Sequence, residues 1–402
     1  MTKWEEKRLG TLIDINPKTL SLKNAPQEIN YIDIASVTAG TLSGYSTIAI
    51  QDAPSRARRI IKEGDTIFST VRPNLKAYYY VKNCPNHPIC STGFAVLQAK
   101  QGVSSRFIYS LVTENSFVNY LTLVAKGSTY PAVDTSDFAK AKVRVPDLPT
   151  QEKIADILSA YDDLIENNNK RIALLEKAAQ ELYKEWFVRF RFPGYENTEF
   201  ENGLPKGWKV QKIKDIASVK SGYAFKSAWW AESGVPVIKI KDISNNTINE
   251  TDLSYVSLDN ANKAKHFFVQ AGDLLIAMTG ATIGKIALVP YMQKTTVNQR
   301  VGKFFLGNSP IDSVGFLYCL LQQRHIQEQI VTIASSNAAQ PNISPFDIEN
   351  LKIVYNDYFI NLFNKMLAPY IKSILILQSK NKNLIKQRDL LLPRLMSGKL
   401  EV

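Results

Sequence analysis

Two segments of the chain place apolar side chains at alternating steps of three and four residues. The first runs from 158 to 186 and the second from 363 to 395. The first set is Leu158, Tyr161, Ile165, Asn168, Ile172, Leu175, Ala179, Leu182 and Trp186. The second set is Phe363, Leu367, Tyr370, Ile374, Leu377, Asn381, Leu384, Arg388, Leu391 and Leu395. Heptad spacing of this kind predicts two long helices, each with one seam that faces a partner helix.

Each seam contains one asparagine, a residue that sets the register of a coiled coil at some cost in stability. We expect the two helices to pack on each other as an antiparallel coiled coil. Arg388 should then face outward or pair with an acid. Pro369 should kink the second helix or lie near its start, because proline lacks the N–H that a helix interior needs.

The remainder of the chain repeats itself. Residues 32–37 (IDIASV) align with 238–243 (IKIKDI), 64–68 (GDTIF) with 272–276 (GDLLI), and 131–133 (PAV) with 341–343 (PNI). The offsets are 206, 208 and 210, and Trp4 and Trp208 stand at offset 204 near the two starts. Four matches in the same order predict two copies of one unit, each too long for a solenoid repeat.

Within each copy, β-branched runs are separated by Gly, Pro and Asn, and wider apolar spacing follows at 107–123 and 314–333. These patterns predict strands followed by short helices, and therefore a mixed α/β (α+β) fold. We expect one globular domain at 1–150, a long helix at 151–192, a second globular domain at 193–352, and a C-terminal long helix at 353–402.

Composition narrows the class of protein. The 402 residues include 49 basic and 37 acidic ones, and the net charge of +12 favours a polyanionic partner, although the excess is scattered. No apolar run approaches the ~18 residues of a membrane span, and the N-terminus lacks a signal-peptide core. Only three cysteines are present, too few for a disulfide framework, so we expect a cytoplasmic protein.

Residues for catalysis or metal binding are not apparent. Cys84, His87 and Cys90 lack a fourth metal ligand. The stretch 280–286 (GATIGKI) has three residues between its glycines instead of four, and isoleucine where a phosphate loop needs Ser or Thr. We therefore expect a binding protein with no metal and no cofactor of its own.

Polar and basic residues gather in loops at matching places of the two copies. Such side chains read base edges and bind phosphates, so we regard them as candidate DNA contacts. Those of the first copy are Arg72, Asn74, Lys76, Lys126, Ser128, Thr129 and Tyr130. Those of the second are Ser221, Tyr223, Lys226, Thr279, Thr282, Lys285, Ser336, Asn337 and Gln340. The loops are polar in both copies but differ in sequence, as two heads that read different half-sites require.

Several motifs give the chain a resemblance to the specificity subunits of type I restriction-modification enzymes. They are Gly207-Trp208, Gly222-x-x-Phe225, 297–300 (VNQR), 182–187 (LYKEWF) and 390–400 (LLLPRLMSGKL). The resemblance implies two variable target-recognition domains that alternate with two conserved helical regions. Each domain would read one half of a split, asymmetric DNA sequence, and the helix pair would set the gap. Residues 158–186 would span about 43 Å, more than one turn of B-DNA.

The resemblance also implies partners. Two modification subunits would bind S-adenosylmethionine and methylate adenine, and two restriction subunits would use ATP and Mg²⁺ to translocate and cut DNA. The chain itself would be non-catalytic. The alternative that the residues leave open is a coiled-coil scaffold that joins two protein-binding domains without contacting DNA. Salt-dependent DNA binding distinguishes the two, because only phosphate contacts release counterions.

Overall fold

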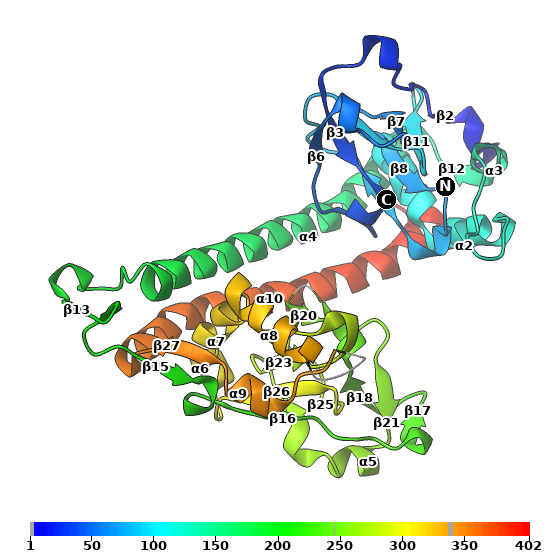
Figure 1. Ribbon diagram of the computed structural model, residues 1–402. Helices are drawn as coiled ribbons and strands as arrows, with labels where there is room; N and C mark the ends of the chain where they lie inside the picture. The colour runs from blue at the N-terminus through cyan, green and yellow to red at the C-terminus, as the bar shows by residue number, and fades with distance from the viewer. Residues whose placement is uncertain (1–3, 245, 337–340) are drawn as a thin grey trace. The chain divides into compact units, whose positions relative to one another are not determined.

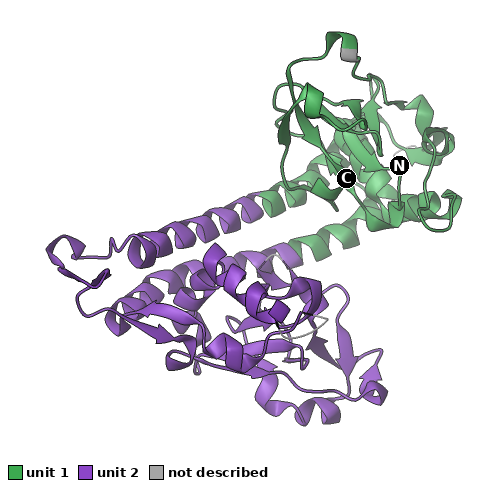
Figure 2. Cartoon of the chain, in the orientation of Figure 1, with its two compact units in different colours: residues 1–166, 383–402 green, residues 167–382 purple. Residues whose placement is uncertain are grey.

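A computed structural model describes residues 4–244, 246–336 and 341–402 (Figure 1). The chain forms two compact units, residues 1–166 with 383–402, and residues 167–382 (Figure 2). The two long helices, α4 (Leu148–Tyr183) and α10 (Asp357–Met396), contribute a segment to each unit. Each unit therefore combines one globular part with a piece of the helix pair.

The first globular part is built on two four-stranded sheets. One has the order β2 (Ile13–Ile15), β11 (Phe94–Ala99), β8 (Thr66–Ser69), β9 (Tyr78–Tyr80). The other has the order β6 (Ser46–Ala49), β3 (Glu28–Ile32), β10 (Pro88–Ser91), β7 (Ala57–Ile60), and its β3–β10 pair is parallel. Two ribbons, β1 (Glu5–Arg8) with β12 (Lys142–Val145) and β4 (Val37–Thr38) with β5 (Thr41–Leu42), complete the strands. The helices are α1 (Ser105–Thr113), α2 (Asn115–Val124) and α3 (Thr135–Lys140).

The second globular part repeats this plan. One sheet has the order β16 (Ser218–Ser221), β26 (Val301–Phe305), β23 (Leu274–Ala277), β24 (Ile286–Leu288). The other has the order β17 (Trp230–Ala231), β21 (Ser254–Val256), β18 (Val235–Ile238), β25 (Thr295–Val297), β22 (Phe268–Val269), and its β18–β25 pair is parallel. The ribbons are β15 (Lys209–Lys212) with β27 (Lys352–Tyr355), β19 (Ile243–Ser244) with β20 (Thr247–Ile248), and β13 (Phe200–Glu201) with β14 (Leu204–Pro205). The helices are α5 (Leu258–Asn262), α6 (Pro310–Ser313), α7 (Gly315–Leu320), α8 (Arg324–Ser336) and α9 (Pro345–Glu349).

The duplication predicted from the sequence is therefore confirmed as a duplication of fold. In the described part of each globular domain, one pair of named strands is parallel, at the same place, and the other named pairs are antiparallel. The mixed α/β class is confirmed as well. Among the described residues, no helix is both long and apolar enough to cross a membrane.

Aromatic side chains fill the two cores. Phe68, Phe107 and Phe138 are fully buried in the first unit. In the second, the Trp208 ring lies 5.0 Å from that of Phe192, centroid to centroid, and both belong to the core. The motif residue Trp208, which helps to carry the family resemblance, is thus a packing residue rather than a contact residue.

The seams of α4 and α10 meet within each unit. In the first, Arg388 Nη1 donates to Asp162 Oδ1 at 2.7 Å, which confirms that Arg388 pairs with an acid. In the second, Asn168 Nδ2 donates to Asn381 Oδ1 at 2.8 Å, and the rings of Tyr183 and Phe363 are 6.1 Å apart. Residues with rising numbers along α4 meet residues with falling numbers along α10, so the predicted antiparallel coiled coil is confirmed.

The second long helix does not begin near Pro369. It starts at Asp357 and continues through the proline to Met396. The Pro369 side chain is exposed, whereas Leu367 and Ile371 on either side are completely buried. Burial of these flanking residues offsets the one backbone hydrogen bond that proline removes.

Candidate nucleic-acid interface

In the first globular part, two candidate loops far apart in sequence lie side by side. The backbone N–H of Arg72 donates to the carbonyl of Pro131 at 2.7 Å, and that of Val133 donates to Thr70 at 2.9 Å. A third strand end joins them, because Thr70 N–H donates to Gly93 O at 2.8 Å. We call the meeting point of these three segments, at 70–72, 93 and 131–133, the first loop junction.

The second globular part has the same junction. Gly280 N–H donates to Pro341 O at 3.2 Å, and Ile343 N–H donates to Met278 O at 3.0 Å. Met278 N–H in turn donates to Arg300 O at 3.0 Å. The three bonds reproduce those of the first junction one for one, so the second loop junction presents its side chains from equivalent backbone positions.

The guanidinium group of Arg72 is held in place by two contacts within the first junction. Its Nη2 donates to Thr129 O at 3.0 Å, and its guanidinium carbon lies 4.7 Å from the centre of the Tyr130 ring. The Arg72 side chain is half-buried, while Tyr130 is 67% exposed. An arginine that is already ordered loses little conformational entropy when it binds a ligand.

The backbone of the loop after β8 is unusual. Arg72 and Lys76 have φ angles of 48° and 56°, in the left-handed region. The matching positions of the second junction are Gly280 and Gly284, with φ angles of 71° and 79°. A side chain in this region costs roughly 1–2 kcal/mol, whereas glycine adopts it freely.

The other candidates of the first junction lie on its surface. Asn74 is exposed, and Lys76 Nζ donates to Asn115 Oδ1 at 2.8 Å. Ser128 is exposed, and the Lys126 ammonium lies 3.6 Å from the Asp134 carboxylate, with both side chains largely exposed. An exposed ion pair is weak, so Lys126 can exchange its partner for a phosphate.

The second junction carries shorter side chains. Lys285 is exposed, while the hydroxyls of Thr279 and Thr282 are buried and have no hydrogen-bond partner among the described residues. Ser336 is exposed at the end of α8. The predicted contacts Asn337 and Gln340 lie outside the residues that the structure describes.

The segment after β16 contributes the remaining candidates. Tyr223 N–H donates to Val297 O at 2.9 Å, and Tyr223 O accepts from Gln299 N–H at 3.0 Å. Ser221 is half-buried within β16, and Lys226 is exposed. The turn that binds Tyr223 also supplies the third strand of the second junction, so these residues belong to one continuous surface segment.

Gln299 and Arg300 were missed as candidate contacts. Both side chains are exposed, and Arg300 O accepts the backbone bond that closes the second junction. The sequence did contain a signal, because 297–300 (VNQR) stands out as a motif with residue types suited to base edges. What it lacked was a counterpart of similar composition in the first copy, where 90–93 reads CSTG.

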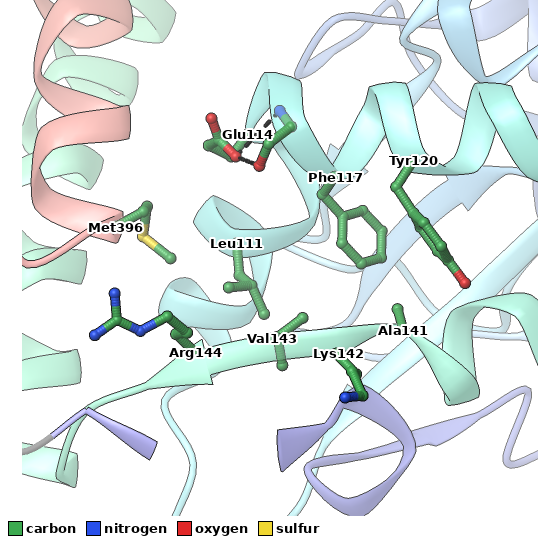
Figure 3. Close-up of a pocket in the computed structure, with 10 residues that line it drawn as sticks. Leu111, Glu114, Phe117, Tyr120, Ala141, Lys142, Val143, Arg144 and Met396 are labelled. Atoms are coloured by element: carbon green, nitrogen blue, oxygen red, sulfur yellow. Dashed lines mark hydrogen bonds between the residues drawn. The ribbon is translucent and has the colours of Figure 1, made fainter. Parts of the chain in front are cut away.

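A pocket of about 310 Å³ lies elsewhere in the first unit, between α1, α2, β12 and the end of α10. Leu111 and Phe117 extend toward β12, and Met396 lies at its α10 side (Figure 3). Arg144 and Lys142 form its basic edge. None of the candidate contact residues lines it.

The cysteine and histidine motif does not gather ligands. Burial raises the pKa of the Cys90 thiol, which lies in the core, and also that of Cys84. Within the described part of the chain, no group of three or more His, Cys, Asp or Glu side chains is placed to hold a metal ion.

Comparison with known proteins gives consistent matches. The family model described as "Type I restriction modification DNA specificity domain" matches residues 1–177 and 205–355. The MjaIX specificity subunit of a type I restriction enzyme from Methanocaldococcus jannaschii is 29% identical, over 92% of this chain and 87% of its own. The HindI specificity subunit from Haemophilus influenzae is 24% identical over the whole of both chains.

A solved structure shares the fold. The S subunit of a type I restriction-modification system from M. genitalium is 16% identical and superposes with a TM-score of 0.57, covering 98% of this chain and 96% of its own. The two family-model matches cover both globular parts described above. The chain belongs to the type I restriction-modification DNA specificity family.

Proposed function

We propose that this chain is the DNA-reading subunit of a type I restriction-modification system. Its domains at 1–150 and 193–352 each read one half of a bipartite, asymmetric sequence. The observation that carries this is the repeated loop junction: identical backbone hydrogen bonds present different side chains in the two globular parts. A duplicated scaffold with altered contact residues is what recognition of two different half-sites needs.

The side chains suit base reading. Arginine binds the O6 and N7 of guanine with two hydrogen bonds, and asparagine binds the N6 and N7 of adenine. Arg72 and Asn74 supply these groups in the first domain. In the second domain Lys285 supplies an ammonium group, together with the polar side chains of Ser221, Gln299 and Arg300, whereas the hydroxyls of Thr279 and Thr282 are buried. Lys76, Lys126 and Lys226 suit phosphate oxygens.

We further propose that the helix pair sets the distance between the half-sites and receives two modification subunits. S-adenosylmethionine would bind to those subunits, and ATP and Mg²⁺ to two restriction subunits, so this chain would direct the chemistry without performing it. The complex would act in the cytoplasm, where the cell's DNA is accessible to it.

The test is to express the chain with its modification partner in a host and to map methylated adenines by single-molecule sequencing. The proposal expects one two-part motif with a fixed gap. DNA affinity of the purified chain should also fall steeply as salt rises. A coiled-coil scaffold without DNA contacts would give neither result, and would leave the host DNA unmethylated.

A further inference from the structure

Four aromatic side chains lie together on the second globular part, in the segment that follows β16. The ring centroids of Tyr223 and Phe225 are 5.0 Å apart, and those of Phe225 and Trp230 are 5.8 Å apart. Tyr223 also lies almost parallel to Trp229, at 6.3 Å and 12°. Phe225, Trp229 and Trp230 pack against a small buried cluster, which consists of Val235, Val237, Val256 and Ala261.

Three lysines cover these rings. The Nζ atom of Lys239 lies 3.6 Å from the centre of the Trp230 ring. Those of Lys263 and Lys226 lie 4.2 Å and 5.5 Å from the centre of the Trp229 ring. Each ammonium is attracted by the negative face of an indole, which holds the flexible lysine in place. We call Trp229, Trp230 and these three lysines the lysine–tryptophan cluster.

The three ammonium groups of the cluster form no direct ion pair within the described residues. None of the three ammonium groups has a carboxylate within 4.0 Å there, and Lys263 Nζ donates instead to Asn260 Oδ1 at 2.9 Å. Lys226 and Lys263 are exposed. Burial and the charge of Lys241 lower the pKa of Lys239 and outweigh the opposing effect of the Asp242 and Asp252 carboxylates.

The cluster is joined to the second loop junction by backbone. Tyr223 exchanges hydrogen bonds with Val297 and Gln299, and the next residue, Arg300, closes the junction. Gly222 makes this approach possible, because a Cβ there would lie 2.4 Å from Val297 O. The turn at Tyr223, whose ring lies almost parallel to that of Trp229, therefore links the cluster to the candidate base-reading loop.

The placement of lysines against the indole rings favours a phosphate ligand over a stacked base. Lysines already lie against the indole rings, so the rings serve to position ammonium groups rather than to stack on bases. Ammonium groups bind phosphate oxygens, and a lysine that contacts only phosphate carries no base specificity. The equivalent segment of the first globular part, 16–20 (NPKTL), contains no aromatic residue.

We propose that Lys226, Lys239 and Lys263 bind the phosphodiester backbone of duplex DNA beside the half-site read by the second domain. The inference rests on the proposed function, and adds to it a sequence-independent anchor in which tryptophan rings position the lysines of the second domain. Such an anchor would strengthen binding to any duplex and would leave the recognised sequence unchanged.

The test uses the full chain with Lys226, Lys239 and Lys263 all replaced by glutamine. Its affinity is measured over a range of salt concentrations, for a random-sequence duplex and for a duplex that carries the methylated motif. The affinity for both should fall by the same factor. The slope of log affinity against log salt should become shallower by about 0.9 for each phosphate that the variant no longer binds, up to about 3.

Two further variants sharpen the result. The triple arginine variant should restore the slope, because arginine keeps the charge and also packs on tryptophan. Lys209→Gln is the matched control, since Lys209 Nζ lies 5.5 Å from the Tyr355 ring in the same unit but away from the junction. Lys209→Gln should leave the slope as in the wild type. The single variants K226Q and K263Q should each reduce the slope by about 0.9, and serve if the triple variant does not fold.

An unchanged slope and affinity in the glutamine variants would overturn the proposal while leaving the proposed function intact. A loss confined to the motif-bearing duplex would overturn it as well, because the lysines would then read sequence. If the wild-type chain itself showed no salt-dependent DNA binding, the proposed function would fail first.

Discussion

Arg72 and Gly280 occupy the same backbone position in the two globular parts. Both N–H groups donate to the carbonyl of a proline, Pro131 or Pro341, and both residues have a positive φ, 48° and 71°. The second domain uses the residue that this conformation favours, whereas the first holds an arginine there at a conformational cost. We infer that the side chain of Arg72 is retained for DNA reading.

Replacing Arg72 and Lys76 by glycine separates stability from recognition. Relief of backbone strain offsets the larger unfolded-state entropy of glycine, so the free energy of unfolding should change by less than about 1 kcal/mol. Affinity for the specific duplex should fall by about 1–3 kcal/mol for each base that Arg72 reads, and further through the phosphate contact of Lys76. Denaturant titration and fluorescence binding measure the two quantities.

Asn83→Gly is the matched control for these variants, since Asn83 has a φ of 49° in the same unit and is not a candidate contact. It should alter neither quantity appreciably. If the two glycine variants bound specific DNA as tightly as the wild type, Arg72 and Lys76 would have no part in reading.

The buried asparagines of the helix pair should couple energetically. Asn168 and Asn381 are each 7% exposed and bonded to each other, and Asn381 Nδ2 also donates to Asn169 Oδ1 at 2.8 Å. Asn381→Leu leaves the Asn168 amide without its partner and should cost about 1–3 kcal/mol. The double variant, Asn168→Leu with Asn381→Leu, should recover most of that loss. Urea unfolding of the two single variants and the double variant would show this. Additive losses would mean that the pair is not a unit.

The length of the helix pair should control the gap in the recognised sequence. Seven residues inserted after Ile172, with seven more after Leu377 on the facing turn of α10, preserve both seams. The pair should lengthen by about 10 Å, or about three base pairs. The methylated motif should keep both halves and gain that spacing. An unchanged gap would refute the proposal that the helix pair sets the distance between the half-sites, although not the proposal that the domains read DNA.

Acid should weaken the contact between α4 and the first globular part. Burial raises the pKa of Asp163, but Lys82 Nζ at 2.6 Å and Arg106 Nη1 at 3.2 Å outweigh burial, and the net pKa is lowered. The folded state therefore binds fewer protons than the unfolded state near the ordinary pKa of 3.8. The stabilisation is present above that value and is lost as the pH falls through the lowered pKa.

The variant Asp163→Asn reports this contribution. Because 49% of the Asp163 side chain is exposed, the loss at neutral pH should stay below about 1 kcal/mol. The difference from the wild type should shrink as the pH falls below 3.8 and vanish once the pH lies below the lowered pKa. Denaturant titrations at several pH values measure it, with Asp312→Asn as an exposed control. A difference independent of pH would show that the charge of Asp163 is not involved.

The helices and the duplication were predictable because they follow from periodicity. Asn168 and Asn381 could each be assigned to the seam of its own helix, since the 3–4 spacing fixes which face each residue occupies. The loop pairs were predictable in part: Thr129 lies 57 residues from Arg72, and only the repeated order of motifs suggested that their loops have related roles.

Other parts of the candidate site depend on tertiary packing that no local pattern shows. Lys239 and Lys263 come from a strand end and a helix end, and join Trp229 and Trp230 only when the second sheet forms. The expected helix start near Pro369 was wrong for the same reason, since burial on both sides overrides the local preference of proline to end a helix.

The most direct measurement of the central claim is a comparison of two methylation maps. One host expresses the wild-type chain with its modification partner, and the other expresses the Arg72→Gly, Lys76→Gly chain with the same partner. We predict a two-part motif in the first map, and in the second a motif with one half relaxed and the other half and the gap unchanged. A motif in one piece, or equal relaxation of both halves, would contradict the claim that each domain reads its own half-site.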